Sequence, residues 1–113
     1  MNSMEKLPDL MEELTGLVEL PEEWNGDGEI PLTFPDRAKE IIREISKYAQ
    51  GTQFYRVNQD RREQWTESVK DKTAAGIYWE IIIKAASAPT RFHAEFTAIG
   101  LMPELSRKLG LEE

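Results

Sequence analysis

The strongest constraint on the fold is the apolar stripe in residues 33–51, TFPDRAKEIIREISKYAQG. Apolar residues recur there at steps of three and four, a spacing that places them on one face of an α-helix. They are Ala38, Ile41, Ile42, Ile45, Tyr48 and Ala49. Pro35 and Asp36 suit a first helical turn, and Gly51 suits a helix end. The segment therefore predicts an amphipathic helix packed against a core.

Three further segments have helical patterns. Residues 8–20, PDLMEELTGLVEL, predict an amphipathic helix that ends before Pro21. Residues 58–76 predict a helix with Asn58 as its cap and Gly76 as its end. Its apolar face is thin, so we expect it on the surface with Trp65 as its main anchor. Residues 103–111 predict a short closing helix, and residues 52–57, TQFYRV, predict a short strand.

The C-terminal third alternates between apolar and polar residues. Residues 77–85 and 92–98 both have a period of two and are joined by the turn-like sequence SAPT. We therefore expect an α+β fold: two N-terminal helices, a surface helix and a small antiparallel sheet built on a hairpin over residues 77–99. An all-α bundle is the alternative, because residues 85–98 contain five alanines and Phe92, Phe96 and Ile99 also fit a helical spacing.

The bulk composition narrows the class of protein. A chain of 113 residues suits a single domain spanning 1–113. The chain has no cysteine, which excludes disulfides, thiolate metal sites and cysteine nucleophiles. No apolar run reaches the ~20 residues of a membrane-spanning helix, and the first residues lack the pattern of a secretory signal. We expect a cytoplasmic protein that uses no cofactor and has no membrane association.

The charge of the chain is concentrated near its start. Residues 1–30 contain nine acidic residues and one lysine, a net charge of −8, whereas residues 31–113 have a net charge of +1. Such a surface repels nucleic-acid phosphates and attracts basic protein surfaces. The candidate partner-binding residues are Glu12, Glu13, Glu22, Glu23, Trp24 and Asp27.

This charge pattern predicts a non-catalytic protein-interaction domain. A regulator, an inhibitor, an immunity protein or a subunit of a complex would fit, and its acidic face could also mimic nucleic acid toward a basic partner. Direct nucleic-acid binding is disfavoured, because Arg61 and Arg62 are diluted by neighbouring acids such as Asp60 and Glu63. The sequence leaves the oligomeric state open.

The segment EEWNGDGEIPLTF, residues 22–34, resembles a calcium-binding EF-hand loop. Counted from Glu23, Asn25, Asp27 and Gly28 occupy the third, fifth and sixth positions of such a loop. Phe34 stands where the loop requires its bidentate acid, so we expect no functional metal site. A weak cation- or ligand-binding site in residues 23–29, with Asn25 and Asp27 as candidate ligands, is the alternative function.

A single histidine, His93, is the only other candidate for chemistry. In the predicted hairpin it shares a face with Glu95, and Glu80 lies across the strand pair. A His–Glu pair can perform acid–base catalysis, which gives a minor alternative, an enzyme. No nucleophile or oxyanion-binding group accompanies the pair, so we expect no enzymatic activity.

Overall fold

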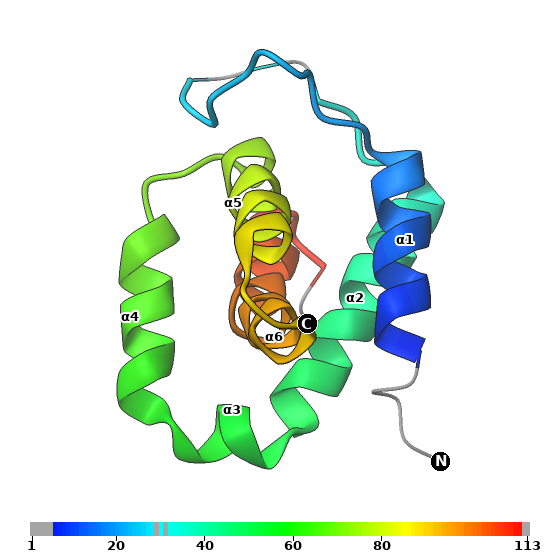
Figure 1. The fold of residues 1–113 in the computed structure, drawn as a ribbon. Coiled ribbons are helices and arrows are strands. Elements are labelled where there is room, and N and C mark those ends of the chain that lie inside the picture. The colour runs from blue at the N-terminus through cyan, green and yellow to red at the C-terminus, as the bar shows by residue number, and fades with distance from the viewer. Residues whose placement is uncertain (1–5, 29, 31, 112–113) are drawn as a thin grey trace.

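Helices make up all the regular secondary structure in the described part of the chain (Figure 1). The computed structural model describes residues 6–28, 30 and 32–111, without the side chains of residues 91, 92, 94 and 95. The helices are α1 (Leu7–Leu17), α2 (Asp36–Gly51), α3 (Gln53–Val57), α4 (Gln59–Val69), α5 (Ala74–Ser87) and α6 (Arg91–Lys108).

The predicted α+β fold is wrong, and the all-α alternative is confirmed. Residues 77–99, expected to form a hairpin of strands, instead form most of α5, a short turn and the first half of α6. The burial pattern of α5 explains the error. Ile77, Tyr78 and Ile81 are buried, whereas Ile83, which the strand pattern places with Ile77 and Ile81, is 42% exposed. The core therefore follows a helical spacing of three and four residues.

Threonine caps fix the starts of the two C-terminal helices. The Thr73 hydroxyl accepts a hydrogen bond from the Gly76 N–H at 3.1 Å, and the Thr90 hydroxyl accepts one from the His93 N–H at 3.2 Å. A side-chain acceptor at this position satisfies a backbone donor that the first helical turn leaves free. Thr90 was predicted to be part of a strand-joining turn, but it begins α6.

Other boundaries also differ from the sequence predictions. Residues 53–57, predicted as part of a strand, form the short helix α3, and the Thr52 hydroxyl caps it by accepting from the Tyr55 N–H at 3.2 Å. The helix predicted over 58–76 ends at Val69, and Gly76 lies inside α5. The predicted closing helix is the end of α6, with Pro103 inside it. The two N-terminal helices are confirmed as α1 and α2.

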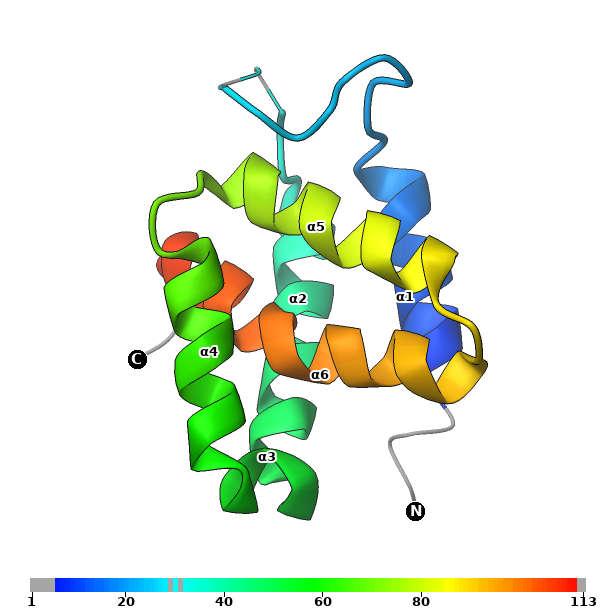
Figure 2. The same ribbon diagram turned by 60° about the vertical axis from the view of Figure 1, so that its left-hand side comes forward.

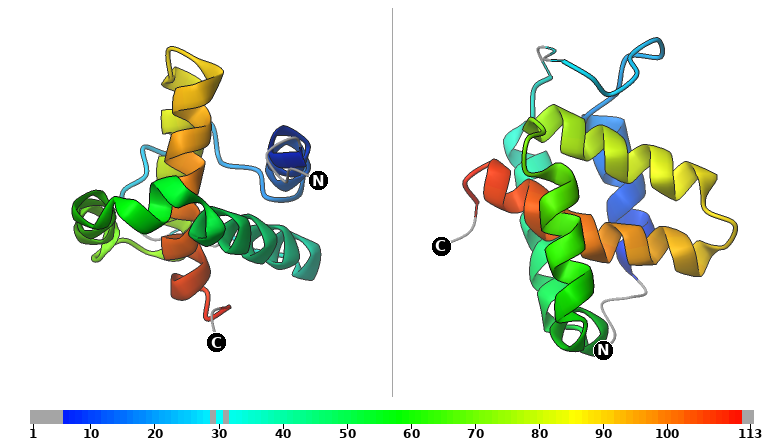
Figure 3. Two further views of the ribbon diagram at one scale, coloured as in Figure 1. Left: turned by 90° about the horizontal axis from the view of Figure 1, so that it is seen from below. Right: turned by 90° about the vertical axis from the view of Figure 1, so that its left-hand side faces the viewer.

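Helix α6 lies at the centre of the fold. It runs antiparallel to α5, and α2, α3 and α4 form an arch across this pair (Figures 1 and 2). Its most extensive contacts are with α2 and α5, while α1 packs on α2 (Figure 3). The largest fully buried side chains include Leu14, Ile41, Ile42, Ile45, Ile77, Tyr78, Ile81, Leu101, Met102 and Leu105. These residues come from α1, α2, α5 and α6, and Val69 of α4 belongs to the same core.

Tyr78 joins this core to the end of α1. Its hydroxyl donates a hydrogen bond of 2.6 Å to the backbone carbonyl of Val18, and its ring meets Phe34 edge-on with 5.7 Å between centroids. Burial raises the pKa of Tyr78 to about 12. The neutral phenol is thus the form that the fold accommodates, because ionisation would place a charge in the core and remove the donor.

We predict an alkaline loss of stability that depends on Tyr78. The pKa is raised from about 10 when unfolded to about 12 when folded, so the folded protein retains the proton longer. The associated stability is present below pH ~10 and is lost as the pH rises toward 12, up to about 2–3 kcal/mol. Tyr78→Phe should cost about 1–2 kcal/mol at neutral pH, because the Val18 carbonyl loses its partner.

Urea unfolding of the native protein and of Tyr78→Phe across this pH range measures the difference. The gap between the two stability curves should narrow above pH ~10. Curves that stay parallel would contradict the assignment, because ionisation of the other tyrosines affects both proteins equally.

Candidate functional site

The loop between α1 and α2 is held in place by two tryptophans. The indole N–H of Trp24 donates to the Asp27 carbonyl at 2.6 Å, and that of Trp79, on α5, donates to the Trp24 carbonyl at 3.2 Å. The two rings meet edge-on with 6.4 Å between their centroids. Trp24 is half-buried in this arrangement. Its main structural role is therefore to fasten the loop to α5.

Gly26 allows this close approach. Its φ of +89° lies in the left-handed region, and an added Cβ would lie 2.5 Å from the Trp79 ring. Only glycine avoids both the backbone strain and the collision. Asn-Gly and Asp-Gly pairs commonly form turns, and both glycines of these pairs, Gly26 and Gly28, have positive φ.

All five predicted partner-binding carboxylates are exposed, but only four of them are free of ion pairs with described residues. Glu12 lies on α1, and Glu22, Glu23 and Asp27 lie in the loop. None of these four carboxylates forms an ion pair with any residue that the structure describes. We call these four residues the acidic surface. Since α1 leads directly into the loop, the four charges lie within one stretch of the chain, residues 12–27.

Glu13, the fifth carboxylate of the predicted set, is engaged within the protein. It accepts two hydrogen bonds from the Arg37 guanidinium, 2.7 Å from Nε and 3.0 Å from Nη2. These hydrogen bonds lower the pKa of Glu13. The pair joins α1 to the first turn of α2, so it orients α1 rather than adding a free charge to the acidic surface.

Of the two candidate metal ligands, the Asn25 side chain is used within the loop, whereas Asp27 contributes only backbone groups to it. The Asn25 side-chain oxygen accepts a hydrogen bond from the Asp27 N–H at 3.0 Å, which closes a tight turn. The Asp27 carbonyl is occupied by Trp24. Among the described residues no group of three His, Asp or Glu side chains could hold a metal ion. Glu29, in the same loop, lies outside the described residues.

The predicted acid–base pair loses its geometry because residues 91–108 are helical. Positions two apart on a helix do not face each other, so the face that His93 and Glu95 would share in a strand does not exist. The Nδ1 atom of His93 lies 2.7 Å from the Thr90 hydroxyl. Glu80 lies on α5 and pairs with Lys84 at 2.9 Å and with Lys72 at 3.9 Å. The side chain of Glu95 is outside the described part.

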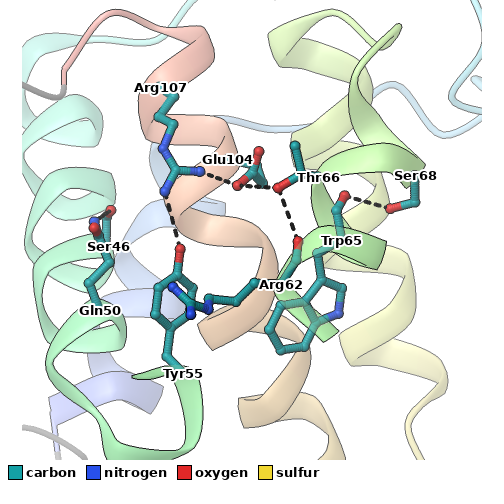
Figure 4. Close-up of polar contacts among 9 residues, drawn as sticks. All are labelled: Ser46, Gln50, Tyr55, Arg62, Trp65, Thr66, Ser68, Glu104 and Arg107. Carbon is teal, nitrogen blue, oxygen red and sulfur yellow. Dashed lines mark hydrogen bonds and ion pairs between the residues drawn. The ribbon is translucent and has the colours of Figure 1, made fainter. Parts of the chain in front are cut away.

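A polar cluster around Tyr55 was missed by the sequence analysis (Figure 4). Arg107 on α6 donates to the Tyr55 hydroxyl at 3.1 Å and pairs with Glu104. Burial lowers the pKa of Arg107, but these two partners outweigh it and raise the pKa. The Thr66 hydroxyl on α4 lies 3.0 Å from the Arg62 carbonyl and 3.3 Å from the Glu104 carboxylate, and its one proton can be donated to either. The cluster therefore joins α3, α4 and α6.

Arg62 completes this cluster in an unusual way. Its guanidinium carbon lies 5.2 Å from the centre of the Tyr55 ring, a cation–π arrangement. Its Nε is buried and has no hydrogen-bond partner among the residues that the structure describes. The contacts join residues up to 52 positions apart, so no local sequence pattern could have indicated them.

Across the described ranges, no helix is both long and apolar enough to cross a membrane. No family model, curated protein or solved structure matches this chain.

Proposed function

We propose that the chain is a small, non-catalytic protein-interaction domain that docks its acidic surface against a basic surface of a partner protein. The observation that carries this proposal is the set of four exposed carboxylates on α1 and the following loop, without ion-pair partners among the described residues. Charges of one sign on a surface speed the encounter with an oppositely charged partner and select against wrong partners.

The construction of the loop supports this role. The Trp24 and Trp79 hydrogen bonds fix the backbone that carries Glu22, Glu23 and Asp27. A loop that is ordered before binding loses less conformational entropy when the complex forms. The Glu13–Arg37 pair likewise fixes the orientation of α1, which carries Glu12, before a partner binds. Trp24 and Glu13 therefore support the surface, and the contacts themselves belong to the four exposed acids.

Several classes of protein are compatible with this arrangement. A cytoplasmic regulator, inhibitor, immunity protein or complex subunit would present such a surface, and so would a mimic of nucleic acid that occupies a basic groove. Cross-linking in the source cell, followed by mass spectrometry, would provide the partner. The cross-linked site on this chain should lie on α1 or in the loop.

Once a partner is isolated, charge neutralisation tests the surface. We predict that neutralising the acidic surface with Glu12→Gln, Glu22→Gln, Glu23→Gln and Asp27→Asn together weakens binding by roughly 10- to 100-fold, mostly through slower association. Surface-plasmon resonance at several salt concentrations measures this, and the salt dependence should flatten.

The matched control removes four exposed acids elsewhere: Glu40→Gln and Glu44→Gln on α2, and Asp60→Asn and Glu63→Gln on α4. It changes the net charge equally but should alter affinity by no more than about threefold. Equal losses in both variants would show that only the net charge matters, and unchanged binding in the first variant would refute the proposal.

A further inference from the structure

A hollow of about 470 Å³ lies between α3 and α4 on one side and the end of α5 and start of α6 on the other. Its apolar lining includes Phe54, Trp65 and Phe96, which come from three different helices. The Phe54 ring lies 4.0 Å from Phe96 and 6.0 Å from Trp65, measured between centroids. All three side chains are half-buried. The hollow is within the size range of small-molecule sites, roughly 300–1,000 Å³.

The charge of the hollow is opposite to that of the chain. Arg61 from α4 and Lys84 from α5 line it, and no Asp or Glu is among the described lining residues, although the chain carries a net charge of −7. Arg61 forms no ion pair with a described residue. Lys84 pairs with Glu80 at 2.9 Å, but an i,i+4 ion pair on a helix whose lysine is half exposed is weak, so another anion can replace Glu80.

Polar groups of the lining limit the ligand further. Ser87, at the end of α5, donates its hydroxyl proton to the Ile83 carbonyl at 2.6 Å, and Thr97, on α6, donates to the His93 carbonyl at 3.1 Å. Both hydroxyls are therefore committed as donors to the backbone. The charged donors that remain for a ligand are Arg61 and Lys84, and a carboxylate satisfies an arginine with two parallel hydrogen bonds.

We propose that this hollow binds a small aromatic carboxylate. The flat ring would lie against Phe54, Trp65 and Phe96, because aromatic rings pack favourably edge-on or offset at such distances. The carboxylate would face Arg61 and Lys84. A hollow with two cations suits a single anionic group better than a nucleic-acid backbone, which requires a row of phosphate contacts. This proposal does not depend on the acidic surface, since none of that surface's four residues lines the hollow.

Two-dimensional NMR with indole-3-carboxylate as the probe tests the proposal. The NMR signal of the Trp65 indole N–H should shift as the probe is added, and the shift should saturate with a Kd of roughly 0.1–1 mM, the affinity expected for a ligand of this size. Trp24 and Trp79, which do not line the hollow, serve as internal references and should not move. The uncharged analogue indole-3-carboxamide should bind at least roughly threefold more weakly, because it lacks the charge.

Substitutions at the hollow separate the charge from the fold. Arg61→Gln and Lys84→Gln should each weaken indole-3-carboxylate binding by roughly three- to tenfold and leave carboxamide binding unchanged. Arg56→Gln, on α3 and outside the lining, is the control and should leave both affinities unchanged. The proposal is overturned if Trp65 shows no saturable shift up to about 10 mM probe, or if the carboxamide binds as tightly as the carboxylate.

Discussion

Replacing Gly100 with alanine is expected to lower the free energy of unfolding by about 2–3 kcal/mol. This is the opposite of what helix propensity predicts, because alanine is about 1 kcal/mol more favourable than glycine inside a helix. Gly100 lies in the middle of α6, and a Cβ there would lie 2.3–2.6 Å from atoms of the Trp65 indole. No real contact is that short. The indole, which packs against Phe54 and the core, would have to leave its position. Its lost packing outweighs the helical preference.

Chemical denaturation with Gly16→Ala as the matched control measures this effect. Gly16 is also helical, in α1, but an added Cβ meets nothing within 4 Å. Gly16→Ala should therefore stabilise the protein by about 0.5–1 kcal/mol. Trp65→Ala provides a second test, because Gly100→Ala made in that background should become neutral or stabilising. A destabilisation by Gly100→Ala that persists without the indole would contradict this explanation.

The crowded surroundings of Gly100 on α6 show why the sequence predicted some helices and missed others. α1 and α2 pack one face on the core, so their apolar stripes are visible in the sequence. α6 is surrounded by α2, α4 and α5, and its buried residues include Ala98, Gly100, Met102 and Ser106. A helix that packs on several sides has no clean stripe, and the chance alternation of residues 92–98 then resembled a strand.

The candidate site was predictable only in its charge. The acidic character of residues 1–30 follows from composition, and the exposure of Glu12, Glu22 and Glu23 agrees with it. The attachment of the loop depends on Trp24 and Trp79, which are 55 positions apart. The calcium-like spacing of Asn25 and Asp27 arises instead from a turn. Contacts of that separation leave no periodic signal, so they emerge only in the folded structure.

The loop itself gives the second large effect, through Gly26. Gly26→Ala should weaken the free energy with which the loop docks on α5 by about 2–4 kcal/mol. The positive φ strains alanine by about 1–2 kcal/mol, and the added Cβ would lie 2.5 Å from the Trp79 ring. Gly28→Ala is the control. Its φ of +75° imposes the same backbone strain, but nothing lies within 4 Å of the added Cβ.

The difference between these two variants isolates the collision with Trp79. Hydrogen exchange of the Trp79 indole N–H, which donates to the Trp24 carbonyl, should be roughly 5- to 30-fold faster in Gly26→Ala than in Gly28→Ala. The core residue Ile77, which is fully buried in α5, should keep its backbone protection in both. Equal exchange in the two variants would mean that the loop is not held by the tryptophan pair. If the acidic surface requires a fixed loop, Gly26→Ala should also weaken partner binding although every carboxylate is retained.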